Sequence, residues 1–167
     1  LDQTSPAIQI NYARCLLSEK KLDQALTQID SAITLDGNMG NAHNVRGLIL
    51  TELDRRQDAL IAFSSALACS HQNIEFMLNK AQLLTLQNEF DDSKKLILCA
   101  RDLSKPGSLD WKNSMIMLGV TLSEGRKTEE ALECYNHLLK YDSKNIGALS
   151  NRGKLYLSKG KLLDAEN

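Results

Sequence analysis

The sequence GNAHNVRGLILTELDRRQDALIAFSSALACSHQN, from Gly40 to Asn73, contains two stretches in which apolar residues recur at helical spacing. The small residues Gly47 and Ala59 lie twelve positions apart, one in each stretch. Antiparallel helices approach closely only where the side chains between them are small, so this spacing predicts a packed pair of helices. The bulky Phe63 is expected to fill the space between successive layers.

The same arrangement of small residues recurs every 34 residues along the chain. Three series have this spacing: Ala13, Gly47 and Ala81; Ala25, Ala59 and Ser93; and Ala32, Ala66 and Ala100. After an offset the spacing returns, from Gly119 to Gly153 and from Ala131 to Ala165. The bulky position between them is occupied by Ile29, Phe63, Ile97 and Tyr135. A fixed period of this length predicts a stack of similar helix pairs.

This spacing resembles the tetratricopeptide repeat, a 34-residue helix–turn–helix unit with small residues at its eighth, twentieth and twenty-seventh positions. The resemblance implies an all-α, right-handed superhelical solenoid of stacked antiparallel helix pairs, with about 4.5 repeats. A single domain of residues 1–167 is expected, with repeats at about 6–39, 40–73, 74–111, 112–145 and a truncated 146–167. Ala165 would then lie in the second helix of the last repeat.

Four residues interrupt the period, because Ala81 and Gly119 are 38 residues apart. They fall around 104–108, where a proline cannot continue the preceding helix. The extra residues are expected to lengthen the loop or to add a turn to the helix ending near Leu103. Ser108 or Asp110 would cap the next helix, and a local change in superhelix pitch is expected.

The charge balance excludes several classes of partner. The chain has 20 Lys and Arg against 21 Asp and Glu, a net charge of −1, so neither nucleic acid nor a membrane surface is expected to bind. No apolar stretch is long enough to span a bilayer. Because the sequence does not begin with methionine, we expect a fragment of a longer protein. A cytoplasmic location is also expected. Its cysteines are expected to be reduced core thiols: Cys15, Cys69, Cys99 and Cys134.

No motif for catalysis or metal binding is recognisable in the sequence. It lacks a glycine-rich phosphate loop, a nucleophile elbow and an HExxH pair, so we expect no enzyme activity, no cofactor and no metal site. The histidines His43, His71 and His137 are far apart in the chain. The acidic pairs at 91–92 and 129–130 are expected in first helical turns, where they complement the helix dipole.

The resemblance also implies where a ligand would lie, since in this family the first helix of each repeat lines the concave face. The candidate peptide-binding residues of that face are Asn11, Arg14, Asn44, Leu48, Asn79, Gln82, Asn113, Met117, Asn151 and Lys154.

Asparagine recurs among these positions. Asn11, Asn79 and Asn151 occupy the sixth position of their repeats, and Asn44 is displaced by one residue. An amide side chain offers both donors and an acceptor, so a row of them can pair with the backbone of an extended peptide. The row resembles the asparagine ladder of the nucleocytoplasmic glycosyltransferase that attaches N-acetylglucosamine, and that of peptide-import receptors. Alternatively, these side chains are solvated or bridge neighbouring repeats.

A second known binding mode of the family, the carboxylate clamp for acidic chaperone C-termini, fits less well. Its five positions correspond to Ile10, Arg14, Val45, Glu75 and Asn79. Only part of the clamp is present, and Glu75 has the wrong charge to meet a carboxylate.

Three functions are compatible with these observations. The first is a protein-interaction module or scaffold that binds a peptide segment of a partner protein. The second is the substrate-recruiting repeat region of a larger enzyme, for example a glycosyltransferase. The third is self-assembly into a homo-oligomer through the exposed apolar edge of the terminal repeat, around Leu155, Leu157, Leu162 and Leu163.

Overall fold

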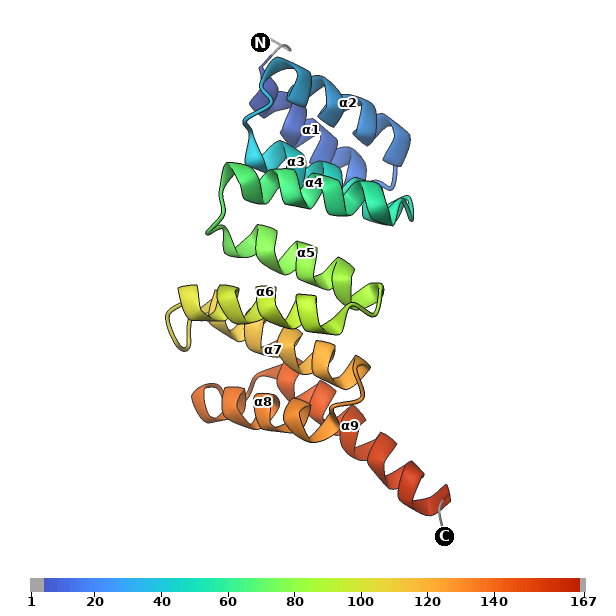
Figure 1. Cartoon of the computed structure of the whole chain (residues 1–167), viewed down its shortest axis with the longest axis vertical. Coiled ribbons are helices and arrows are strands. Elements are labelled where there is room, and N and C mark those ends of the chain that lie inside the picture. Colours follow the sequence, from blue (N-terminus) through green and yellow to red (C-terminus); the bar gives the residue numbers. More distant parts are fainter. Residues whose placement is uncertain (1–4, 166–167) are drawn as a thin grey trace. The chain divides into compact units, whose positions relative to one another are not determined.

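A computed structural model describes the backbone of residues 5–165 and the side chains of residues 5–160. This part of the chain is entirely α-helical, as predicted (Figure 1). Its helices are α1 (Pro6–Ser18), α2 (Leu22–Leu35), α3 (Gly40–Glu52), α4 (Arg56–Cys69), α5 (Ile74–Leu86), α6 (Phe90–Leu103), α7 (Leu109–Glu124), α8 (Thr128–Tyr141) and α9 (Ile146–Ala165).

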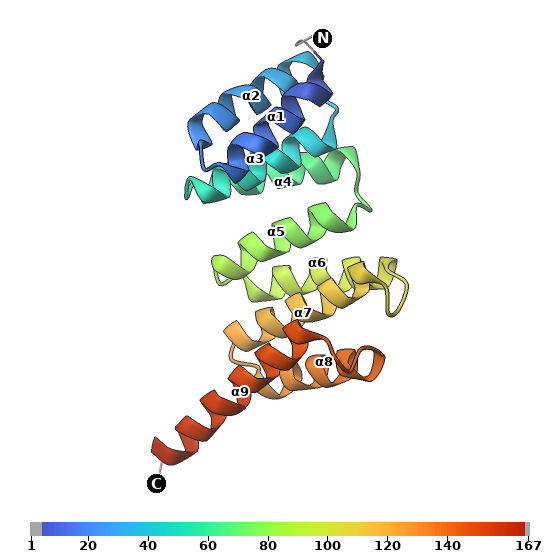
Figure 2. The same ribbon diagram turned by 180° about the vertical axis from the view of Figure 1, so that it is seen from behind.

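The chain divides into two compact units, Leu1–Leu83 and Leu84–Asn167, which are described separately below. In the first unit α1 packs on α2, α3 packs on α4, and the first helices α1 and α3 also contact each other. In the second unit α7 packs on α8 and also contacts α9. Figure 2 shows α1 and α3 on the near side of the first unit, and α7 and α9 on the near side of the second. The expected single domain stays a prediction.

The small residues lie at the helix crossings, as the period predicted. Ala59 is fully buried, and a Cβ atom at Gly47 would lie 2.5 Å from Cε1 of Phe63. In the second unit Gly119 has the same relation to Tyr135, again at 2.5 Å. An aromatic ring of the second helix therefore occupies the volume that a side chain on the first helix would need, and this contact fixes the separation of the two helices.

One small position uses hydrogen bonds instead of apolar contact. Ser93 on α6 is fully buried, and its hydroxyl lies 2.8 Å from that of Thr85 on α5. The Thr85 hydroxyl is also 2.9 Å from that of Thr121 on α7. Within the second unit, the last residues of α5 are therefore joined to α6 and α7 by hydroxyl groups that hydrogen-bond to one another.

The turns inside the helix pairs share one backbone geometry. Lys20, Asp54, Asn88 and Arg126 all have a left-handed φ, between 56° and 64°. In each turn the following residue donates a backbone hydrogen bond across the turn, as from Lys127 N to Leu122 O at 2.8 Å. The left-handed residue reverses the chain at the end of the first helix and leaves few carbonyl groups unsatisfied.

The four additional residues differ in part from the prediction. The loop before α7 gains one residue relative to the other loops between pairs, and α7 has 16 residues where α3 and α5 have 13. The extra turn therefore belongs to the helix that follows the loop, and not to the helix that ends at Leu103. The Ser108 side chain caps this turn by accepting a hydrogen bond from Trp111 N at 3.3 Å.

Packing explains why the additional turn forms on α7. Trp111 belongs to that turn and is buried, with its ring centroid 4.8 Å from that of Tyr141 and 5.6 Å from that of His137. An extension of α6 would not place an aromatic residue against these rings of α8. The predicted change in superhelix pitch stays a prediction.

The end of the chain also differs from the prediction. α9 is one continuous helix from Ile146 to Ala165, so Ala165 does not lie in a separate second helix. The consequence is visible at Gly153, where an added Cβ atom would meet no atom within 4 Å.

The prediction of buried cysteines is wrong. Cys15, Cys69 and Cys99 are exposed and Cys134 is half-buried. Cys99 directly precedes the buried Ala100, and one residue corresponds to a rotation of about 100° around the helix axis. The thiol therefore lies beside the buried stripe of α6 and not within it.

Candidate peptide-binding surface

Six of the ten candidate residues belong to the first unit, on α1, α3 and α5. Asn11, Arg14 and Gln82 are exposed, and Leu48 and Asn79 are half-buried. Asn44 is different, because only 3% of its surface is exposed. The exposed members can reach a ligand without any rearrangement of the helices, whereas Asn44 cannot.

The amide of Asn44 joins α3 to α5. Its Nδ2 donates a hydrogen bond to Oε1 of Glu75 at 3.2 Å, and its Oδ1 accepts one from Nδ2 of Asn79 at 2.9 Å. Both ends of the buried amide are thereby satisfied, which removes most of the cost of burying it.

This network bears on the alternatives for the asparagine row. Asn44 and Asn79 bridge neighbouring first helices, and direct peptide contact by Asn44 is not supported. Asn44 is buried whereas Asn11 is exposed, because the displacement of Asn44 by one residue turns its side chain about 100° around α3. For Asn11, Asn79 and Asn151, contact with a peptide stays a prediction.

Glu75 occupies a clamp position in the sequence but was not included among the ten candidate residues, although Glu75 and Asn79 are bonded to the same residue. The spacing of the two could have indicated the network, because residues four apart share one face of a helix. The missing information was the partner on α3, which depends on how the helices pack.

The remaining four candidates belong to the second unit. Asn113 and Met117 lie on α7, and Asn151 and Lys154 on α9; Asn113 and Lys154 are exposed and the other two half-buried. α7 and α9 approach closely, since a Cβ atom at Gly147 would lie 3.0 Å from Cδ1 of Ile116.

An ion pair lies beside these residues. Lys112 Nζ donates to Asp142 Oδ2 at 2.8 Å, and this bond, with a second from Asn145, lowers the pKa of the Asp142 carboxyl group. Asp142 follows α8, so the pair ties the start of α7 to the loop before α9.

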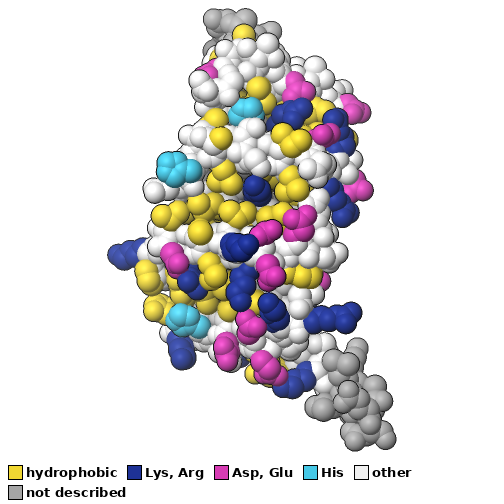
Figure 3. Space-filling view, in the orientation of Figure 1, with side chains coloured by type: hydrophobic (Ala, Val, Ile, Leu, Met, Phe, Trp, Pro, Cys, Tyr) yellow, Lys and Arg dark blue, Asp and Glu magenta, His cyan; other side chains and the backbone are white. Residues whose placement is uncertain are grey.

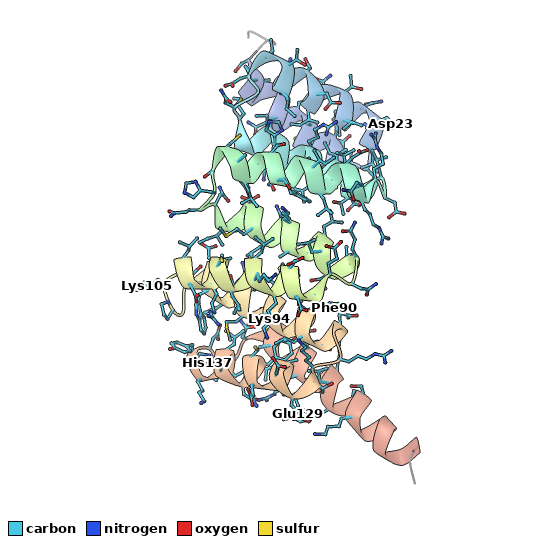
Figure 4. The ribbon with its side chains drawn as sticks, viewed as in Figure 1. Asp23, Phe90, Lys94, Lys105, Glu129 and His137 are labelled. Atoms are coloured by element: carbon cyan, nitrogen blue, oxygen red, sulfur yellow. The ribbon has the colours of Figure 1, made fainter. Side chains whose placement is uncertain are left out.

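The second-helix side carries charges of both signs. Figure 3 shows basic and acidic side chains interspersed on the face turned toward the viewer in Figure 1. Several are paired: Lys94 Nζ lies 3.1 Å from Glu130 Oε2, and Lys159 Nζ lies 2.6 Å from Glu129 Oε1. Lys94 and Glu129 are labelled in Figure 4. Mixed charges of this kind give no field that would attract a polyanion.

Two of the histidines contact a carbonyl group or aromatic rings. His43 Nε2 lies 2.9 Å from the carbonyl oxygen of Gly37, and His137, labelled in Figure 4, contacts the rings of Trp111 and Tyr141. Among the described residues there is no group of three or more His, Cys, Asp or Glu side chains that could hold a metal ion. Within the same part of the chain, no helix is long and apolar enough to cross a membrane.

The sequence and the fold both match known repeat proteins. A sequence model of the family described as TPR repeat matches residues 124–160, which include α8 and much of α9. PilF of Pseudomonas aeruginosa superposes with a TM-score of 0.80 at 16% identity, over 96% of this chain and 72% of PilF. The chain has the fold of tetratricopeptide repeat proteins. Their helices pack in sequential pairs, as in the solved structures of this fold.

Two further tetratricopeptide repeat structures are similar to the chain. YrrB, a TPR protein with an unusual peptide-binding site, has a TM-score of 0.71 at 21% identity, over 95% of this chain and 80% of YrrB. A thermophilic TPR protein of Thermus thermophilus has a TM-score of 0.80 at 16% identity, over 93% of this chain and 84% of the Thermus protein. At such identities the likeness concerns the fold alone. Among curated proteins, no sequence matches this chain.

Proposed function

We propose that this protein is an interaction module that binds an extended peptide segment of a partner protein along the first helices within a unit. The observation that carries the proposal is the exposure of polar side chains on those helices, namely Asn11, Arg14 and Gln82 in the first unit and Asn113 and Lys154 in the second. Amide and charged groups at regular intervals suit the repeating backbone of an extended chain.

The comparisons give this proposal indirect support. YrrB has the same fold and a peptide-binding site, although an unusual one. The matched family is described as a TPR repeat and no match names a catalytic activity, so the hypothesis of a repeat region that recruits substrate for a larger enzyme stays a hypothesis.

A titration with synthetic peptides tests the proposal. The protein is screened on an array of peptides of varied sequence, and the strongest binders are then titrated in solution by fluorescence anisotropy. Asn11→Ala is expected to weaken binding about three- to tenfold, because it removes one or two hydrogen bonds to the ligand. Asn11 is exposed, so its replacement should leave the helical circular dichroism unchanged.

Gln24→Ala supplies the matched control. Gln24 is also an exposed amide of the first unit, but it lies on α2, a second helix. Its replacement should leave the affinity unchanged. Equal affinities for the wild type and Asn11→Ala, or an equal loss in both variants, would show that the peptide does not bind along the first helices.

A second candidate function, self-association, has one specific observation in its favour. α9 exposes large apolar side chains, with 82% of Ile146 and 70% of Leu157 accessible to solvent. Of the predicted exposed apolar edge, Leu157 is exposed but Leu155 is buried. The side chains of Leu162 and Leu163 lie outside the described residues.

Sedimentation velocity at several concentrations tests self-association. A sedimentation coefficient that rises with concentration, and rises less for Leu157→Ser, is the expected result. Ile61→Ser is the control, since Ile61 is an exposed apolar residue on α4. A protein that stays monomeric at every concentration would exclude this function.

A further inference from the structure

A hydrogen bond from Asn44 holds the carboxylate of Glu75 in place on α5. Glu75 lies in the first turn of α5 and is exposed, while its hydrogen-bond donor Asn44 is buried in α3. The donor is itself fixed, because its other end accepts the hydrogen bond from Asn79. An exposed side chain is thus restrained by a buried one.

This restraint favours ligand binding. An exposed glutamate loses side-chain entropy when it forms an ion pair, and this loss cancels much of the gain in most surface pairs. The hydrogen bond from Asn44 Nδ2 to Glu75 Oε1, at 3.2 Å, restricts the side chain before any ligand arrives. Less entropy is then lost on binding, which is the usual benefit of preorganisation.

The charge of Glu75 is also available. Among the described residues, the hydrogen bond from Asn44 is the polar interaction that Glu75 makes, and no lysine or arginine of this part of the chain is paired with it. Two other acidic residues of the first unit differ in this respect, since Glu52 on α3 is paired with Lys20 at 2.6 Å and Asp30 on α2 with Arg46 at 2.7 Å.

We propose that Glu75 binds a lysine or arginine side chain of the peptide, and so selects for a basic residue at this point of the surface. This inference rests on the proposed peptide-binding function. Arginine fits best, because its guanidinium group can donate two parallel hydrogen bonds to a carboxylate.

A positional-scanning peptide array tests the selection. Each pool fixes one residue at one position and randomises the others, and binding to wild type is compared with binding to Glu75→Gln. The wild type should favour arginine and lysine at one position. Glu75→Gln can still accept the hydrogen bond from Asn44 and should lower the affinity for the arginine pool about three- to tenfold. Glu75→Lys should shift the preference at that position to aspartate and glutamate.

Two further measurements complete the test. Glu133→Gln makes the same change of charge at an exposed position on α8, a second helix, and should leave the preference unchanged. The preference for arginine should also weaken as salt is added, because salt screens partly exposed ion pairs.

The outcomes separate this inference from the proposed function. If the wild type binds peptides without a basic preference, or if Glu75→Gln keeps that preference, the assignment of Glu75 is wrong and the binding function stands. If no pool binds at any salt concentration, both are wrong.

Discussion

Gly47 of α3 lies against the ring of Phe63 of α4, so closely that a methyl group on Gly47 would lie within 2.8 Å of three ring atoms. Phe63 is 1% exposed and is enclosed by the neighbouring helices, so its ring has little room to move. The distance between the two helices of this pair is therefore set by the absence of one carbon atom.

Gly47→Ala is expected to destabilise the protein by about 1–3 kcal/mol. Alanine is the better helix former by about 1 kcal/mol, but the overpacking against Phe63 costs more than that gain. Urea unfolding followed by circular dichroism measures the difference. Gly153→Ala is the control at the same repeat position, and it should stabilise the protein slightly because no atom lies within 4 Å of the new Cβ. Equal effects of the two substitutions would contradict the packing argument.

Arg126→Gly is expected to stabilise the second unit by about 0.5–1 kcal/mol. Arg126 has a φ of 61°, a region that costs roughly 1 kcal/mol for most residues and nothing for glycine. Thermal unfolding should show a higher Tm. Asn88→Gly, at the corresponding turn, should gain less, because asparagine tolerates this backbone conformation well. A loss of stability in Arg126→Gly would show that the arginine side chain makes a contact worth more than the strain.

Thr85→Val should destabilise the protein more than Ser93→Ala does. Thr85 is the hydroxyl bonded to both others, at 2.8 and 2.9 Å, whereas Ser93 and Thr121 are 3.5 Å apart. Replacing Thr85 removes both short hydroxyl hydrogen bonds and should cost about 2 kcal/mol; replacing Ser93 removes one of them and should cost about 1 kcal/mol. Chemical denaturation of the two variants measures the order, and the reverse order would disprove the central role of Thr85.

Tyr135 should make stability fall at alkaline pH. Burial raises the pKa of its hydroxyl to about 12, from an ordinary value near 10. Between these values the unfolded chain has released this proton and the folded chain has not, so stability is complete below pH 10 and declines by about 2–3 kcal/mol up to pH 12.

The measurement is the free energy of unfolding across that pH range, with Tyr135→Phe as the comparison. The variant has no proton to release at this position, so its stability should fall less steeply. Parallel curves for the two proteins would mean that the hydroxyl group ionises normally in the folded state.

The helical architecture could be predicted from sequence because its cause is local and repeated. Gly47, Ala59 and Phe63 recur with a fixed period, and each copy of the pattern supports the same packing. Features that depend on one particular contact could not be predicted. The extra turn of α7 forms because Trp111 meets Tyr141, and nothing in the period predicts that pairing.

The candidate site was predictable only to the level of the helix face. Asn11, Arg14 and Gln82 are exposed at positions taken from the family pattern. The role of Asn44 was not predictable, because its buried amide on α3 is paired with Glu75 on α5, and that pairing depends on how the two helices pack. A periodic pattern predicts which side of a helix a residue occupies, but it does not predict which partner the side chain finds.

The position of Trp111 has a practical consequence for following the folding of this protein. It is the one tryptophan of the chain, and it is buried between α7 and α8 in the second unit. Its intrinsic fluorescence therefore reports the melting of that unit, while far-ultraviolet circular dichroism reports the helices of both. Coincident transitions would show that the two units unfold as one cooperative body, and separate transitions would show that each half of the chain can lose its structure alone.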